Sequence, residues 1–256
     1  MNNMILYDTN KLENYLVSYS GTNLDSSTIG YCYDNRSDNG YLNWNSLAGN
    51  IVFGFSATMS ISEFMILNHN FLSGSVDILV GGTWTSVFGF GFADNAVVNS
   101  GTFQSQYFRV NFSYTIDGNV GQCGEIVLTN KKFQLNYNPS GYNHGITNQY
   151  IENQLWTGLV NRTEISQLFN AVLAYELLQG DDSGMVDTDL QNLTELARNK
   201  QSFLFYPNGN STDYPMAYGW RKRDIYKCKI MNDYNFTTPL PYMTIITASY
   251  ELREVK

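Results

Sequence analysis

The sequence predicts a mainly β protein, with a β-sandwich over residues 1–132 and an α+β domain over residues 133–256. Three observations lead to this prediction. Short apolar segments recur through the first half, and their apolar residues alternate with polar ones, as in strands that bury one face. Segments rich in Gly, Asn and Asp, which favour turns, separate them. Sustained helical periodicity is found mainly in the second half.

Five strands are expected in the first domain. Segment 106–112 shows the alternation best, because Tyr, Arg and Asn occupy its odd-numbered positions and Phe, Val and Phe the even-numbered positions from 108 on. Successive side chains of a strand point to opposite faces, so this segment has one apolar and one polar face. The expected strands are Ile51–Phe55, Ser62–Leu67, Ser75–Val80, Gln106–Phe112 and Gly124–Thr129.

The second domain is expected to hold a small antiparallel sheet with one or two helices. The first helix is predicted over residues 163–179, where apolar residues recur at helical spacing from Ile165 to Leu177. A second, weaker helix is predicted from Asp187 to Asn199. The joint at 128–132 is short and polar, so we expect the two domains to pack together. Further strands are expected at Phe133–Tyr137, 202–206, Arg223–Met231 and Tyr242–Glu254.

The composition argues against several classes of function. The chain has 256 residues, a formal net charge of -8, 15% charged residues and 15% aromatic residues. Disordered chains are rich in charge and nucleic-acid-binding domains carry a basic patch, so neither class is expected. No apolar stretch approaches the roughly 20 residues of a membrane-spanning helix. The first residues lack the basic and apolar regions of a secretory leader, so we expect synthesis in the cytoplasm.

Residues for catalysis or metal binding are sparse. The chain has two histidines, His69 and His144, and neither lies in a motif for a nucleophile, a metal or a phosphate. Segment 34–40 has the composition of a calcium loop, but Arg36 occupies a ligand position and the required Glu is missing. We therefore expect a protein that is not an enzyme, with no catalytic residue, no metal and no cofactor. A polysaccharide hydrolase is a further alternative, since 23 acidic residues offer many carboxylate pairs.

Aromatic residues in or near loops are the candidates for ligand binding. Tyr31, Tyr41 and Trp84 lie in or beside expected turns of the first domain. Aromatic rings in such positions stack on sugar rings or anchor a protein partner. The alternative is that these rings close the ends of the sandwich and bind nothing.

Segment 53–86 carries a more specific pattern: a strand that runs into His69-Asn70, a short turn, a second strand and then Trp84. This pattern resembles the discoidin-like (galactose-binding-like) jelly rolls of tailed-phage virion proteins. Segments 106–113 and 121–135 fit the same pattern, with an aromatic-Arg strand followed by a glycine and a strand that contains Glu-Ile. The second half is similar in outline to the companion domain of such proteins, and to tail-tube and distal-tail folds.

The resemblance implies a non-enzymatic structural component of a phage virion: a tail, baseplate, adaptor or fibre-anchoring subunit that acts through protein–protein contacts. It implies a location in the virion after synthesis in the host cytoplasm, with other tail proteins as partners. We expect a homo-oligomer, either a ring or a trimer, without nucleic acid and without membrane insertion. The alternative is a carbohydrate-binding module for host-receptor recognition, in which Tyr31, Tyr41 and Trp84 contact a host surface glycan.

Overall fold

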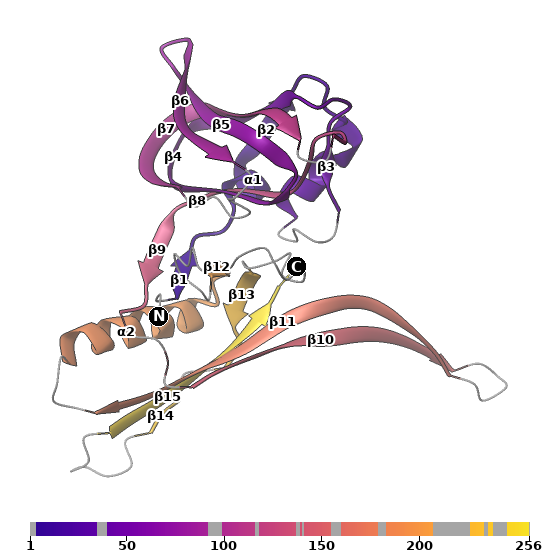
Figure 1. Cartoon of the computed structure of the whole chain (residues 1–256). Helices are drawn as coiled ribbons and strands as arrows, with labels where there is room; N and C mark the ends of the chain where they lie inside the picture. The colour runs from indigo at the N-terminus through magenta and orange to yellow at the C-terminus, as the bar shows by residue number, and fades with distance from the viewer. Residues whose placement is uncertain are drawn as a thin grey trace.

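The structure is a computed structural model of the chain. It describes residues 4–34, 40–91, 99–115, 118–136, 139, 141–154, 160–178, 183–206, 226–232, 235–237 and 245–255. Within these residues the chain forms two antiparallel sheets and two α-helices (Figure 1). The mainly β prediction, with a sandwich in the first half and an α+β arrangement in the second, is therefore confirmed.

The first sheet curls around its own core. Its strand order is β3-β8-β4-β7-β5-β6, and β2 pairs with β4. The long strand β4 pairs with β2 near its beginning, with β7 from Gly49 to Phe64, and with β8 from Glu63 to His69. The strands are β2 (Leu16–Ser20), β3 (Leu42–Asn43), β4 (Gly49–His69), β5 (Phe71–Val80), β6 (Thr83–Gly91), β7 (Asn99–Thr115) and β8 (Gln122–Thr129).

Stacked aromatic rings fill this first core. The Phe71 ring lies 4.3 Å from the Phe112 ring, and the Trp44 ring meets both edge-on. The indole of Trp44 also donates to the carbonyl of Asn50 at 3.0 Å, so its polar atom is satisfied inside the core. Each of the five expected strands lies within an observed one, but 51–55 and 62–67 are two parts of β4, joined by the exposed stretch 56–58.

The second sheet has the order β10-β11-β15-β13-β12-β1-β9, and β14 pairs with β15. Helix α2 (Ser183–Asn199) covers one face of it and buries Leu190, Leu193 and Leu196. This confirms the second predicted helix. The strands are β1 (Ile5–Tyr7), β9 (Lys131–Gln134), β10 (Gly141–Gln154), β11 (Val160–Leu178), β12 (Phe203–Tyr206), β13 (Tyr226–Ile230), β14 (Asn235–Thr237) and β15 (Ile245–Glu254).

The helix predicted over 163–179 is wrong, because the described part of this segment, up to Leu178, belongs to strand β11 (Val160–Leu178). Phe169 and Leu173 are four residues apart, a spacing that fits both the helical and the strand period. Ala171 and Tyr175, between and beyond them, are buried as well, whereas Val172 is 39% exposed. This alternation has the period of two of a strand, and pairing with β10 and β15 on either side fixes it.

The two sheets meet in a small apolar seam. Strand β1 pairs with β9 and β12, so the first described residues belong to the second sheet. The predicted domain boundary at residue 132 stays a prediction. Strand β9 (Lys131–Gln134) includes residues on both sides of it. The seam consists of Ile5, Tyr7, Leu204 and Tyr206 from the second sheet and Met65, Leu67 and Val127 from the first.

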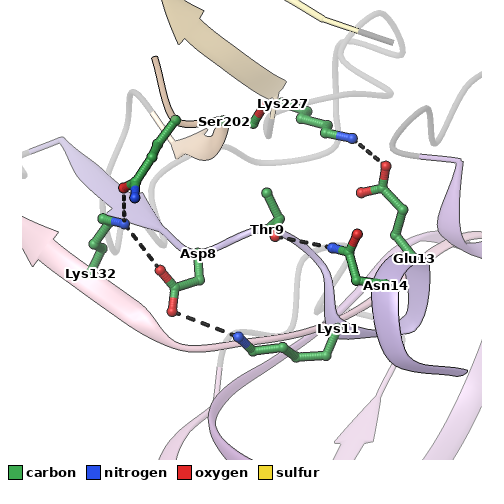
Figure 2. Close-up of a pocket in the computed structure, with 9 residues that line it drawn as sticks. Asp8, Thr9, Lys11, Glu13, Asn14, Lys132, Ser202 and Lys227 are labelled. Carbon is green, nitrogen blue, oxygen red and sulfur yellow. Dashed lines mark hydrogen bonds and ion pairs between the residues drawn. The ribbon is translucent and has the colours of Figure 1, made fainter. Parts of the chain in front are cut away.

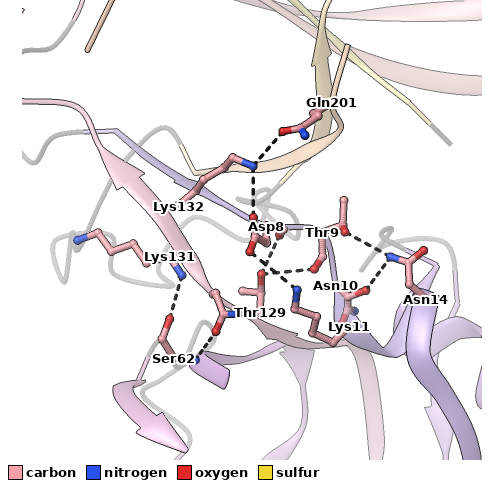
Figure 3. Close-up of polar contacts among 11 residues, drawn as sticks. Asp8, Thr9, Asn10, Lys11, Asn14, Ser62, Thr129, Lys131, Lys132 and Gln201 are labelled. Carbon is pink, nitrogen blue, oxygen red and sulfur yellow. Dashed lines mark hydrogen bonds and ion pairs between the residues drawn. The ribbon is translucent and has the colours of Figure 1, made fainter. Parts of the chain in front are cut away.

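Asn10 lies where the chain passes from β1 to the first sheet (Figure 3). Its amide nitrogen donates to the carbonyl of Ile126 at 2.8 Å, and its side-chain oxygen accepts from the backbone N–H of Leu128 and of Leu12, each at 3.1 Å. The side chain is fully buried. Asn10 therefore takes the place of a neighbouring strand along β8 and caps helix α1 (Lys11–Tyr15).

A buried carboxylate lies beside the seam. Glu63 is 4% exposed, and its Oε2 and the hydroxyl of Tyr7 have no hydrogen-bond partner among the described residues. Burial raises the pKa of Glu63 to about 7, although Lys131 partly opposes the shift. Removing a carboxylate from water disfavours its charged form, which is the physical cause.

Stability is expected to fall as the pH rises from about 4.5 to about 7 because of this group. In that window the unfolded chain releases the Glu63 proton while the folded chain keeps it, which favours unfolding. Well above pH 7 the loss is complete and amounts to about 3 kcal/mol. Urea unfolding of the wild type and of Glu63→Gln at several pH values checks this. Identical pH dependence of the two proteins would contradict it.

Candidate functional site

A row of polar side chains lies on the outer face of β5, β6 and β7. Asp77 is opposite Arg109 in the β5–β7 ladder, and Ser75 is opposite Asn111. Trp84 follows on β6, opposite Leu79 of β5. Neighbouring residues along these strands, namely Val76, Phe108 and Val110, point into the first core. Strand alternation therefore brings the five polar and aromatic side chains to one surface.

The carboxylate of Asp77 organises this surface. Its Oδ2 accepts from Arg109 Nε at 2.9 Å, from Arg109 Nη2 at 2.5 Å and from Asn111 Nδ2 at 2.7 Å. Its Oδ1 accepts from the hydroxyl of Ser75 at 3.1 Å. Asp77 is buried, so the fork from Arg109 compensates its charge, and charge-assisted bonds of this kind are the strong ones. The guanidinium group is thus held in one orientation.

Trp84 completes the surface. The guanidinium carbon of Arg109 lies 4.4 Å from the centroid of the Trp84 ring, within the range of a cation–π contact. The Arg109 side chain is 26% exposed, and Trp84 is partly exposed. In the described part of the chain, neither the indole N–H nor the guanidinium nitrogen Nη1 has a protein acceptor. An aromatic ring and several fixed donors therefore face outward together.

The structure places the three aromatic residues predicted from sequence in two regions. Tyr31, in the 3-10 helix Ser26–Tyr33, is 41% exposed, and its ring lies against Gly40. Tyr41 follows directly, and its hydroxyl accepts from Asn68 at 3.2 Å. This region adjoins β3, near the beginning of β5, whereas Trp84 lies near the end of β5. That any of the three binds a ligand stays a prediction.

Sequence reasoning did not select Asp77, Arg109 or Asn111 as site residues. The one available signal was the polar face of segment 106–112, which carries both Arg109 and Asn111. Asp77 is 32 residues away from Arg109, and only the register of β5 with β7 shows that they face each other. A register of this kind depends on the whole sheet, so it cannot be read from the local pattern.

A second polar site is a cleft of about 420 Å³ at the joint between the two sheets (Figure 2). Asp8 pairs with Lys11 at 3.8 Å and with Lys132 at 3.4 Å. Glu13 of α1 pairs with Lys227 of β13, which ties the first sheet to the second. Each charged side chain that lines the cleft is ion-paired with another, so we interpret the cleft as an ion-paired joint. Its lining residues are Asp8, Thr9, Lys11, Glu13, Asn14, Lys132, Gln201, Ser202 and Lys227.

The described residues contain neither a helix suited to cross a membrane nor a cluster suited to hold a metal ion. No described helix is both long enough and apolar enough to cross a membrane. Among the described residues, no group of three or more His, Cys, Asp and Glu side chains is placed to hold a metal ion. His69 is buried, and its Nδ1 accepts from the backbone N–H of Phe71 at 3.1 Å.

No protein-family model matches the sequence, and no curated protein matches it. Several solved structures resemble part of the chain. CpGH89CBM32-6 from Clostridium perfringens has a TM-score of 0.40 and 18% identity, over 46% of this chain and 97% of its own. The family 32 carbohydrate-binding module of Streptococcus pneumoniae EndoD has a TM-score of 0.37 and 8% identity, over 44% of this chain and 97% of its own. SpGH29 has a TM-score of 0.39 and 11% identity, over 45% of this chain but only 27% of its own. Likeness at this level does not identify the function of this chain.

Proposed function

We propose that the chain is a carbohydrate-binding protein and that the outer face of β5, β6 and β7 is its binding surface. One observation carries this proposal: Arg109 is fixed against the ring of Trp84 by the carboxylate of Asp77. Sugars present hydroxyl oxygens, which accept hydrogen bonds, and apolar C–H faces, which pack on aromatic rings. This surface has the guanidinium of Arg109 as a donor for the oxygens and the ring of Trp84 for the C–H faces.

Preorganisation supports the same proposal. A free arginine side chain loses rotamer entropy when it binds a ligand, at a cost of roughly 0.5–1.5 kcal/mol. In this protein the Arg109 side chain has already lost that rotamer entropy on folding, because Asp77 and Trp84 hold its guanidinium in place. The groups that remain for a ligand are donors, namely the guanidinium Nη1 and the indole N–H, because the amide nitrogen of Asn111 already donates to Ser75 and Asp77. The ligands that fit are therefore sugars that present acceptor oxygens, among them hydroxyl and carboxylate groups.

A glycan array with the intact chain tests the proposal first. Wild type is expected to retain a defined set of glycans, and Trp84→Ala is expected to lose them. Tyr31→Ala is the matched control, because it removes an aromatic ring from the other region of the same domain. An array on which wild type and Trp84→Ala give the same signals would contradict the proposal.

A second candidate function is a non-enzymatic structural subunit of a phage virion. The feature that favours it is the long hairpin of β10 and β11, which extends away from the rest of the molecule (Figure 1). Projecting hairpins of this kind serve as contacts between subunits, since they offer backbone groups for pairing. Mass spectrometry of purified particles from the source strain tests it. A virion subunit is expected in stoichiometric amount, and its absence from the particles would contradict this role.

A further inference from the structure

A second aromatic residue, Tyr107, lies on the same face of the first sheet as Trp84. Tyr107 precedes Phe108 on β7, and Phe108 points into the core, so Tyr107 points outward. In the β5–β7 ladder Ile78 pairs with Phe108, which makes Leu79 the next neighbour of Tyr107. Leu79 in turn pairs with Trp84 of β6. Tyr107, Leu79 and Trp84 are each partly exposed and therefore form one row across β7, β5 and β6.

The ring of Tyr107 lies over the backbone of Gly54. Gly54 is the partner of Tyr107 in the ladder of β4 with β7. A Cβ atom at this glycine would come within 3.0 Å of Tyr107 Cε1, so the absence of a side chain leaves the space that the ring occupies. Strand β4 lies on one side of β7, and β5 and β6 lie on the other. The ring of Tyr107 therefore leans away from Trp84.

Ser105 holds the backbone beneath this row in place. Its hydroxyl oxygen lies 2.8 Å from the carbonyl oxygen of Tyr107 and 3.0 Å from that of Leu79, and it accepts from the backbone N–H of Tyr107 at 3.1 Å. Ser105 is buried, so these contacts are shielded from water. They join β5 and β7 at the point where the row crosses from one strand to the other. The row is therefore preorganised for a ligand.

Hydrogen-bond donors accompany the two rings. In the described part of the chain the hydroxyl of Tyr107 has no protein partner, as holds for the indole N–H of Trp84 and for Nη1 of Arg109. Arg109 is two residues from Tyr107 on β7, so both side chains point to the same face, about 7 Å apart along the strand. Donors thus lie at both ends of the row, next to the aromatic rings.

The two aromatic residues are too far apart to share one sugar ring. Tyr107 and Trp84 belong to strands that are separated by β5, and two strand spacings amount to about 9.5 Å. We propose that the surface binds an extended glycan chain that lies across the strands, with one sugar residue on Trp84 and another on Tyr107. This inference rests on the proposed function and adds that the ligand is a chain of sugars, not a single terminal sugar.

A size series of glycan fragments tests the proposal. The fragments are cut from the best glycan on the array, from the single sugar upward, and their affinities are measured by isothermal titration calorimetry. Wild type is expected to gain about tenfold in affinity once a fragment is long enough to reach from Trp84 to Tyr107. Tyr107→Ala is expected to lose this gain. If Tyr107 only supported the fold, its substitution would weaken the binding of short and long fragments alike.

Two further variants serve as controls for Tyr107→Ala. Tyr107→Phe keeps the ring and removes the hydroxyl, so it is expected to retain most of the gain with fragment length. Tyr31→Ala removes a ring from the other aromatic region and is expected to retain all of it. Circular dichroism shows whether each variant is folded. The size series on the wild type requires no substitution, so it decides the question even if Tyr107→Ala is unstable.

Two results would overturn the proposal. One is a wild-type affinity that does not increase with fragment length, and the other is a Tyr107→Ala variant that keeps the full increase. Either result leaves the proposed function intact, provided that Trp84→Ala still loses its glycans. The proposed function itself fails if the array retains no glycan with the wild type, or if Trp84→Ala binds as the wild type does. The two proposals are therefore distinguished by the same set of proteins.

Discussion

Trp84→Ala is expected to weaken carbohydrate binding by about 30-fold or more. Central aromatic residues of a binding surface typically contribute 2 kcal/mol or more, and every 1.4 kcal/mol is about tenfold in affinity. The substitution removes the ring that would contact the sugar and also frees the guanidinium of Arg109, which now lies 4.4 Å from the ring centroid. Isothermal titration calorimetry with the best glycan from the array measures the loss.

Two comparison variants show whether a loss of glycan affinity comes from the binding surface or from a general loss of structure. Arg109→Lys keeps the positive charge but cannot reproduce the two bonds from Nε and Nη2 to Asp77, so we expect an intermediate loss of affinity. Tyr31→Ala, in the other aromatic region, is expected to bind as the wild type does. If Tyr31→Ala lost as much affinity as Trp84→Ala, the surface on β5, β6 and β7 would not be the binding site.

Asn10→Ala is expected to lower the free energy of unfolding by about 2–4 kcal/mol. The substitution leaves the carbonyl of Ile126 and the N–H of Leu128 without the side-chain partner that now satisfies them. Both groups lie in the interior, where an unpaired polar group costs about 1–3 kcal/mol. It also removes the N-cap of α1. Urea unfolding followed by circular dichroism measures the change.

Asn14→Ala is the matched control for this prediction. Asn14 has the same side chain four residues along the chain, but it is exposed and its two bonds are long, at 3.3 and 3.4 Å. We expect a change below about 0.5 kcal/mol, as for most surface substitutions. Equal effects of Asn10→Ala and Asn14→Ala would show that Asn10 does not hold β8 in place.

The general architecture could be predicted because it depends on local periodicity. The expected strands of the first domain and helix α2 show patterns that a single period explains, and the structure confirms them. Strand β11 could not be predicted, since Phe169 and Leu173 fit both periods and the decisive neighbours, β10 and β15, are brought to it by the fold. Tertiary pairing overrides local propensity in such segments.

The candidate site could be predicted only in part, for a similar reason. Trp84 was selected because an aromatic residue after a Gly-Gly turn is a local feature. Its partners Arg109 and Asp77 belong to different strands and meet through register. The role of Asn10 could not be predicted either, because its hydrogen bonds reach Ile126 and Leu128, more than 100 residues away in the sequence.

The most direct test of carbohydrate binding at this surface is an NMR titration that follows the indole N–H signals. Trp84 is assigned from its missing signal in Trp84→Phe, and Trp44 is an internal reference because its indole N–H is bonded to Asn50 in the core. We expect the glycan to shift the Trp84 signal in a saturable way and to leave the Trp44 signal unchanged. A glycan that binds while the Trp84 signal stays fixed would contradict it.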